Sequence, residues 1–151
     1  MKIVKDDLSG EAIAAFLREH LKNMERNSPP GCVYALDLDG LRARDVTFWS
    51  IWEDESLLGC GALKELNARQ GEVKSMRTAS AHLRQGIGGA MLRHLIDVSR
   101  ERGYSRLSLE TGSGPAFAAA DALYRTFGFD YCGPFGDYRE NTFSRFMTLT
   151  L

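Results

Sequence analysis

Several absences restrict what this 151-residue chain can be. It contains no apolar run near the ~20 residues that a membrane-spanning helix needs, and residues 1–7 include no apolar signal-peptide segment. Its three cysteines, Cys32, Cys60 and Cys132, are odd in number and scattered, which argues against a disulfide framework. Low-complexity tracts and internal repeats are missing as well. We therefore expect one globular domain spanning residues 1–151, in a reducing cytoplasm and not bound to a membrane.

A strong excess of one charge sign is also absent, since the net charge is −1. This near-neutral balance makes nucleic acid an unsuitable partner. The charges are nevertheless uneven, because residues 74–106 hold seven Lys or Arg against two acidic residues, whereas residues 1–73 hold nine basic and thirteen acidic residues. The pattern favours a polyanionic ligand on the middle segment and a cationic one near the N-terminal half, although solvated helix faces produce similar clusters.

Hydrophobic periodicity predicts the element order β-α-β-β-β-α-β-α-β-β, which is an α/β (α+β) fold with a mixed, mostly antiparallel sheet flanked by helices. Residues 41–45 are expected to form a short helix or a loop. The predicted helices run from Ser9 or Gly10 to the Ser28–Gly31 stop, from Ala90 to Arg102, and from Pro115 to Phe127. The predicted strands are Lys2–Lys5, Val46–Glu53, Leu57–Glu65, Glu72–Thr78, Arg106–Thr111, Phe129–Cys132 and Ser144–Leu151.

The glycine-rich turn Leu83–Gly89, Leu-Arg-Gln-Gly-Ile-Gly-Gly, lies directly before the second predicted helix. The free N–H groups and partial positive charge of a helix N-terminus favour phosphate. A nucleotide P-loop would need Gly-Lys-Ser/Thr, which is absent. A dinucleotide-binding fingerprint would place its third glycine at Met91, although Glu110 after the next strand keeps an oxidoreductase module open as an alternative.

Two motifs resemble those of the GNAT superfamily, the acetyl-CoA-dependent N-acetyltransferases. Leu83–Gly88 is similar to the motif Q/R-x-x-G-x-G/A, with Leu83 in place of Gln or Arg. Ala120–Phe129 is similar to A-x-x-L-Y-x-x-x-G-F, with Phe117 where the family often has asparagine. The motifs stand in the family's order, and the resemblance covers residues 46–151 well and the N-terminal part by element order.

The resemblance implies a GNAT fold, in which the fourth and fifth strands splay apart and admit the pantetheine arm of acetyl-CoA. The pyrophosphate would bind main-chain N–H groups of the turn. The main chain at Met76 and Thr78 would face pantetheine and the acetyl carbonyl, whose developing oxyanion a backbone donor stabilises. No metal is implied, and no metal-ligand spacing occurs. The expected cofactor-binding residues are Met76, Arg77, Thr78, Leu83, Arg84, Gln85, Gly86, Ile87, Gly88, Gly89, Ala90, Phe117 and Tyr124.

Two residues are the candidates for catalysis. Tyr124 matches the tyrosine that the family uses as general acid toward the leaving thiolate, and the alternative is a core tyrosine under the cofactor. Glu72 lies eleven residues before Leu83, the spacing of the glutamate base in some histone-type members. An ammonium acceptor must lose a proton before it attacks, which a carboxylate can accept. Glu65 and Glu110 are alternative bases, and an exposed hairpin glutamate is the other interpretation of Glu72.

The remaining candidates have weaker support. His82 adjoins the turn, whereas His20 and His94 lie on helices without evident partners. Cys132 is expected to be a structural thiol. Trp49 and Trp52 lie on opposite strand faces and are expected to pack in the core or in a homodimer. The acceptor pocket is expected at Ser28–Asp39 and Asp137–Asn141, where an ammonium group would meet Asp37, Asp39, Asp137 and Tyr138.

The sequence therefore predicts an N-acetyltransferase that moves an acetyl group from acetyl-CoA to a primary amine of a small metabolite or amino-acid-like acceptor. Direct attack is expected, because no cysteine or serine stands in a triad-like setting. Two alternatives remain within the same fold, namely a non-catalytic acyl-CoA-binding sensor and a protein or peptide N-acetyltransferase.

Overall fold

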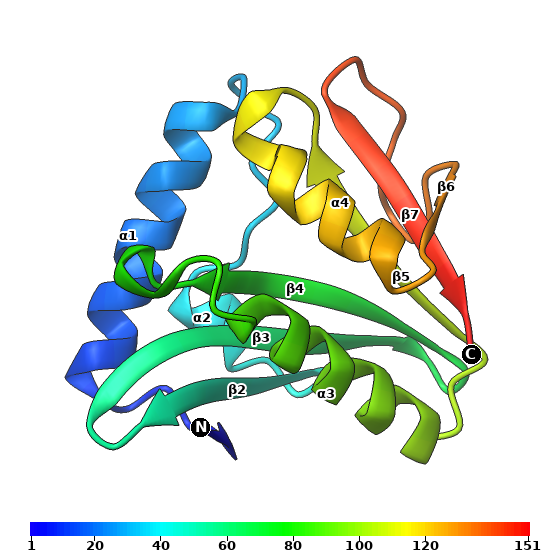
Figure 1. Cartoon of the computed structure of the whole chain (residues 1–151). Helices are drawn as coiled ribbons and strands as arrows, with labels where there is room; N and C mark the ends of the chain where they lie inside the picture. The colour runs from blue at the N-terminus through cyan, green and yellow to red at the C-terminus, as the bar shows by residue number, and fades with distance from the viewer.

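The computed structural model describes all residues, 1–151, and contains one seven-stranded sheet with the order β1-β2-β3-β4-β5-β7-β6 (Figure 1). Only the β4–β5 pair is parallel. The strands are β1 Lys2–Lys5, β2 Val46–Glu53, β3 Ser56–Asn67, β4 Gln70–Thr78, β5 Arg106–Gly112, β6 Asp130–Cys132 and β7 Ser144–Thr150. The helices are α1 Glu11–Asn27, α2 Leu38–Leu41, α3 Ile87–Glu101 and α4 Ala118–Thr126, with 3-10 turns at Ser80–His82 and Pro115–Phe117.

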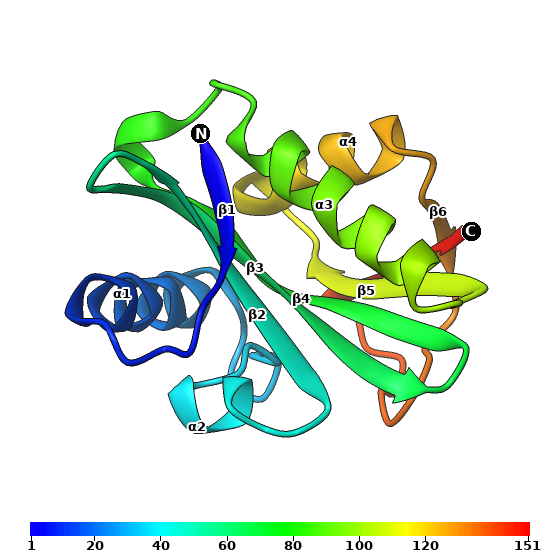
Figure 2. The same ribbon diagram turned by 90° about the horizontal axis from the view of Figure 1, so that it is seen from below.

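The helices cover the two faces of the sheet in pairs, with α1 and α2 on one face and α3 and α4 on the other (Figure 2). Each face has its own hydrophobic core. The larger core joins Met91, Leu92 and Leu95 of α3 to strand residues such as Ile51 and Leu107. The smaller core joins α1 and α2 to the opposite side of β2 and β3. The sheet therefore separates two distinct sides of the molecule.

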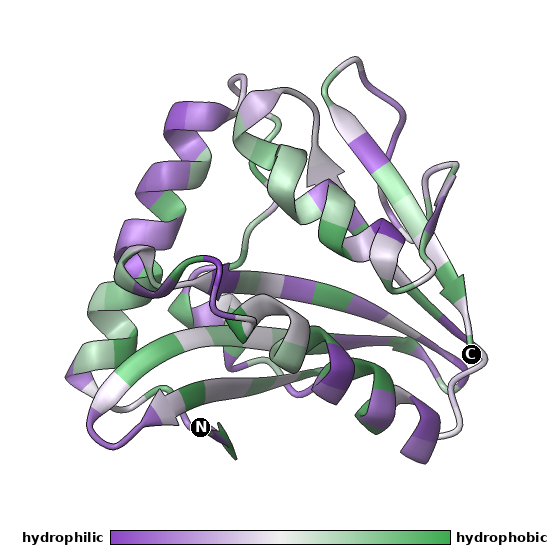
Figure 3. Cartoon of the chain, viewed as in Figure 1, coloured by the Kyte–Doolittle hydropathy of each residue, from purple (hydrophilic) through white to green (hydrophobic).

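Both long helices are amphipathic, as their colouring in Figure 3 shows. On α1 the buried residues Ile13, Leu17 and His20 recur at helical spacing, and the outer face is charged. Helix α3 buries a wider apolar stripe and ends before Gly103, whose φ of 80° supplies the left-handed residue of a C-terminal cap.

The parallel pair β4–β5 is short. Its register runs only from Gln70↔Arg106 to Glu72↔Ser108, although β4 continues to Thr78 and β5 to Gly112. Beyond Glu72 the two strands diverge, as Figure 1 shows. The predicted splay between the fourth and fifth strands is thereby confirmed, and it leaves an opening between the two strands that a cavity occupies.

A β-bulge in β4 lies beside this opening. The register with β3 shifts between Cys60 and Ala62, and Ser75 has a φ of 51°. An extra residue in one strand bends it and increases its twist. The thiol of Cys60 donates to the carbonyl of Ser75 across the bulge, at 3.1 Å. The bulge therefore helps to turn the second half of β4 away from β5.

The predicted element order is confirmed, with three corrections. Helix α3 begins at Ile87 rather than Ala90, because Gly88 and Gly89 take helical geometry once Gly86 has turned the chain. Residues 41–45, expected to form a short helix or a loop, follow a short helix at Leu38–Leu41, where the Asp37 carboxylate accepts from the Gly40 N–H. The helix expected over Pro115–Phe127 is divided into a 3-10 turn and α4. None of the helices is long and apolar enough to cross a membrane.

Candidate functional site

The glycine turn before α3 forms a cradle of free main-chain donors. Arg84 and Gly86 have φ of 62° and 81°, so the chain turns sharply into the helix. The first main-chain hydrogen bond of α3 runs from the Ala90 N–H to the Gly86 carbonyl, and the N–H groups of Ile87, Gly88 and Gly89 have no main-chain acceptor. No side chain caps this helix end. The turn therefore has the geometry and polarity that suit a phosphate group.

The three glycines of the turn serve different purposes. Gly86 supplies the left-handed conformation, and a Cβ there would meet open space. A Cβ on Gly88 would lie 3.2 Å from Leu123 Cδ2 of α4, so this glycine permits close packing between the two helices. A Cβ on Gly89 would lie 3.8 Å from the ring of Phe127, just beyond α4, which is an ordinary packing distance. The turn and the second sequence motif are therefore in direct contact.

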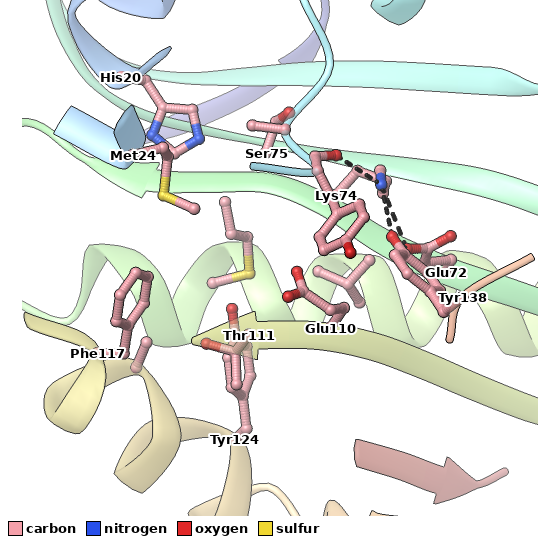
Figure 4. Close-up of a pocket in the computed structure, with 15 residues that line it drawn as sticks. His20, Met24, Glu72, Lys74, Ser75, Glu110, Thr111, Phe117, Tyr124 and Tyr138 are labelled. Atoms are coloured by element: carbon pink, nitrogen blue, oxygen red, sulfur yellow. Dashed lines mark hydrogen bonds and ion pairs between the residues drawn. The ribbon is translucent and has the colours of Figure 1, made fainter. Parts of the chain in front are cut away.

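A cavity of about 110 Å³ lies where β4 and β5 separate (Figure 4). Strand β4 contributes residues 72–76, β5 contributes Glu110 and Thr111, and α4 contributes Tyr124. Helix α1 and the segments around Tyr34 and Tyr138 complete the wall. The lining residues are His20, Met24, Tyr34, Ala35, Glu72, Val73, Lys74, Ser75, Met76, Glu110, Thr111, Phe117, Ala120, Tyr124 and Tyr138.

Glu72 belongs to a buried polar network at the closed end of this gap. Its side chain is 3% exposed, and its Oε2 accepts from the Tyr138 hydroxyl and lies 3.3 Å from Lys74 Nζ. Lys74 also donates to the Tyr138 oxygen at 2.9 Å and to the Tyr34 carbonyl at 3.1 Å. Burial, followed by the charge of Glu72, raises the pKa of Tyr138 and keeps this phenol protonated. The network holds the 138 loop over the gap.

Glu110 faces the same cavity from β5, two residues beyond the last β4–β5 pair (Figure 4). Burial raises the pKa of its carboxyl group, and the negative charge of Glu72 adds to the effect, whereas Lys74 opposes it. A carboxyl group with a raised pKa is a better proton acceptor near neutral pH than an ordinary one. Of the two alternatives to Glu72, Glu110 lies in the cavity, whereas Glu65 accepts from the Tyr104 hydroxyl outside it.

Tyr124 reaches the cavity from α4 and is 8% exposed. Burial raises the pKa of its phenol to about 12, and the nearby charge of Glu110 contributes. Its ring packs edge-on against Phe129, at a centroid distance of 5.9 Å. The side chain is therefore a fixed, protonated hydroxyl at the edge of the gap.

His20 enters the cavity from α1 and has a partner that the sequence did not suggest. Its ring is 6% exposed, and its Nδ1 lies 3.5 Å from Nη1 of Arg77. Burial, with a contribution from the guanidinium, lowers the pKa of His20 to about 4. The expectation that this histidine has no partner is wrong. His94 packs edge-on against Trp49 in the larger core.

The expected cofactor residues divide between the two faces. Leu83 and Arg84 lie exposed at the turn, on the α3 side. Met76 and Phe117 line the cavity, and the ring of Phe117 packs against Phe143 at 5.5 Å. The side chain of Arg77 instead lies against His20 and the ring of Phe16 on α1, so only its main chain is free to face the gap.

The expected acceptor residues are only partly gathered at the cavity. Tyr138 lines it, whereas Asp37, Asp39 and Asp137 are absent from its wall. Sequence reasoning missed the roles of Lys74, Tyr34 and His20 in the cavity wall. The i, i+2 spacing of Glu72 and Lys74 on one strand face was a usable signal for their pairing. Cys132 lies outside the cavity, and no group of His, Cys, Asp and Glu side chains is placed to hold a metal ion.

Comparisons with known proteins agree with this geometry. The family described as Acetyltransferase (GNAT) family matches residues 13–129. The uncharacterized N-acetyltransferase YsnE of Bacillus subtilis (strain 168) is 52% identical over 151 residues, which is all of both chains. The uncharacterized N-acetyltransferase YedL of Escherichia coli (strain K12) is 48% identical over 149 residues, 99% of this chain and 94% of that one.

Solved structures show the same fold. An acyl-CoA N-acyltransferase from Klebsiella pneumoniae aligns with a TM-score of 0.75 and 25% identity over 99% of this chain and 97% of that chain. A GNAT family acetyltransferase from Elizabethkingia anophelis, solved with acetyl-CoA bound, aligns with a TM-score of 0.68 and 16% identity over 99% of this chain and 97% of that chain. The family match, the full-length relatives and the fold together show that this chain belongs to the GNAT family and is an N-acetyltransferase.

Proposed function

We propose that the chain transfers an acetyl group from acetyl-CoA to the primary amine of a small metabolite or amino-acid-like acceptor, by direct attack within a ternary complex. The observation that carries this proposal is the opening between β4 and β5. A turn with free main-chain donors lies on the α3 face, and a cavity lined by two carboxylates and a phenol lies where the strands separate. An acyl donor bound on one face and an amine bound on the other would meet in it.

The donor side fits acetyl-CoA through the main chain. The free N–H groups at Ile87–Gly89 and the N-terminal end of α3 suit the pyrophosphate, and Arg84 adds positive charge. The pantetheine arm would follow β4 past Thr78 and Met76, where the diverging strand leaves main-chain groups without a β5 partner. A main-chain donor at this position would stabilise the developing oxyanion.

The two carboxylates of the cavity would share the work of the base. The charge of Glu72, which lies beside Lys74 and the Tyr138 hydroxyl, helps to raise the pKa of Glu110. Glu110 would take the proton from the acceptor ammonium, directly or through water. Glu72 would keep the cavity negative and attract the ammonium.

Tyr124 would act as the general acid. Its phenol stays protonated at neutral pH, since its pKa is about 12. The departing thiolate, whose thiol has a pKa near ~8.5, is a weaker base than the Tyr124 phenolate. The charge separation of the tetrahedral intermediate would therefore have to assist the proton transfer from the phenol to the sulfur. The cavity is small, about 110 Å³, which favours the primary amine of a small molecule over a folded protein surface.

The test is release of free thiol from acetyl-CoA in the presence of an amine panel that contains amino acids, simple amines and short peptides. We expect turnover with small amines, and a loss of about 10²-fold or more in kcat for Glu110→Gln. Thermal stabilisation by CoA without thiol release for any amine would instead support a non-catalytic sensor. Turnover restricted to peptide N-termini would overturn the choice of acceptor.

A further inference from the structure

The imidazole of His20 is a buried polar group that faces the cavity. It lies on α1, on the face of the sheet opposite the glycine turn, and is 6% exposed. It lines the cavity together with Met24 of the next helical turn (Figure 4). Its Nδ1 contacts Arg77, and its Nε2 has no hydrogen-bond partner in the chain. Nε2 keeps some exposed surface toward the cavity, so a ligand or water can reach it.

Arg77 determines which ring nitrogen of His20 carries the proton. A guanidinium group has only donors, so the nitrogen beside it, Nδ1, must be the acceptor. In the neutral ring the hydrogen then lies on Nε2. His20 therefore presents a single N–H donor to the cavity, and the positive charge of Arg77 polarises it from behind.

Arg77 also lacks a counter-ion within the protein. It takes part in none of the four salt bridges, and its Nε is buried without a hydrogen-bond partner. Its neighbours are the ring of Phe16, at 5.7 Å, and His20. Arg77 is half-buried, and a partly desolvated cation without a counter-ion would bind a nearby anion favourably.

The cation in the cavity wall, Lys74, is already neutralised. Lys74 contacts the Glu72 carboxylate, the Tyr138 hydroxyl and the Tyr34 carbonyl, which accounts for its three donors. Figure 4 shows this group and Glu110 away from the His20 end of the cavity. The cavity thus has a negative part that suits an ammonium group and a separate donor end at His20.

We propose that the acceptor carries a carboxylate beside its amine, and that His20 binds this carboxylate through Nε2–H with Arg77 behind it. The inference rests on the proposed function and gives its acceptor a chemical class, the amino acids and related amino carboxylates. His20 is then a specificity-determining residue, and Arg77 is a positioning residue that acts through it.

The test compares three acceptors that share one carbon skeleton, namely an amino acid, its primary amide and its decarboxylated amine. For the wild-type protein we expect kcat/KM to favour the amino acid by about 10- to 100-fold, as a charge-assisted hydrogen bond supplies. The difference should lie mainly in KM. In His20→Phe and Arg77→Met this preference should fall to near unity, whereas His20→Gln and Arg77→Lys should keep part of it.

The matched control is His94→Gln, which removes an imidazole outside the cavity and should leave the preference unchanged. CoA binding by each variant verifies that the protein is folded. Equal kcat/KM for the three wild-type acceptors, or an unchanged preference in His20→Phe, would overturn the inference.

A binding measurement separates this inference from the proposed function. In ¹⁵N NMR spectra, the wild-type His20 ring should show the Nε2–H tautomer, and the amino acid should shift this signal more than the decarboxylated amine does. If no amine is acetylated but this shift is seen, the carboxylate site stands and the proposed function falls. If the amino acid leaves the signal unmoved, the carboxylate site is refuted.

Discussion

The two faces of the sheet are built in different ways. On the α3 face, the turn offers main-chain donors and glycine conformations, with Arg84 exposed beside them. On the α1 face, the cavity is formed by side chains from distant parts of the chain, including His20, Lys74 and Tyr138. A pyrophosphate is common to all reactions of one cofactor, whereas an acceptor differs from enzyme to enzyme. Main-chain recognition suits the first, and side-chain recognition suits the second.

The comparison predicts where substitutions should act. Changes on the α3 face should alter the affinity for the acetyl donor, and changes on the α1 face should alter acceptor choice and proton transfer. Tyr124 is the exception, because it reaches the gap from α4 and is proposed to act in the reaction itself. Substitutions on each face therefore test this division.

The largest effect is expected for Tyr124→Phe. Removal of the phenolic proton should lower kcat by about 10²- to 10⁴-fold, the usual contribution of a general acid. The ring remains to pack against Phe129, so stability and CoA affinity should stay close to those of the wild type. Thiol-release kinetics and calorimetric CoA titration measure the two quantities. Undiminished kcat would refute the acid role.

The second effect concerns His20 and acid stability. Since burial lowers its pKa from 6.5 to about 4, the folded state favours the neutral ring. The unfolded state takes up the proton as the pH falls below about 6.5. The contribution of His20 to the free energy of unfolding is therefore at its full value above pH 6.5. It decreases by roughly 3 kcal/mol as the pH falls toward 4. His20→Gln should lose correspondingly less stability between pH 7 and pH 4 in urea titrations. Parallel losses in both proteins would contradict the buried neutral ring.

The third effect concerns the left-handed backbone conformation of Gly86, where an added side chain would make no contact. With a φ of 81°, alanine there should cost about 1–2 kcal/mol, because side chains are strained in the left-handed region. If the strain is relieved by deforming the turn, the Kd for CoA should rise by about 5- to 30-fold. Gly86→Asn is the matched control, since asparagine tolerates this conformation better. The ratio of acceptor preferences should not change in either variant, and a changed ratio would contradict the division between the faces.

The smallest effect is a pair of opposite shifts in the pH profile. The Glu72 charge raises the pKa of Glu110, and Lys74 lowers it. Glu72→Gln should therefore move the acid limb of kcat/KM to lower pH, and Lys74→Met should move it to higher pH. Profiles between pH 5 and pH 9 measure both. Shifts in the same direction would show that Glu110 is not the group that titrates.

The α3 face could be predicted from the sequence better than the cavity on the α1 face. The element order could be predicted from local hydrophobic patterns, and the splayed strands from the family resemblance that the turn at Gly86 and the helix around Tyr124 carry. Helix α3 was placed three residues late, because consecutive glycines conceal a helix start. The network around Lys74 could not be found, since Tyr34 and Tyr138 reach it from segments that no local pattern joins.

His20 shows the limit most clearly. In the sequence it occupies the apolar stripe of a helix, where a histidine is an ordinary core residue. Its contact with Arg77 spans 57 positions and depends on how β4 bends at the Ser75 bulge. A buried pair of this kind is determined by tertiary packing. Local patterns therefore pointed to the turn and to the Tyr124 helix, whereas the contacts of the cavity wall became visible only in the structure.

The most direct test of direct attack through the gap is the initial rate of thiol release over a matrix of acetyl-CoA and amino acid concentrations. We expect intersecting double-reciprocal lines, because both substrates must bind before the acetyl group moves. Parallel lines, together with an acetylated protein detected by mass spectrometry when no amine is present, would contradict it.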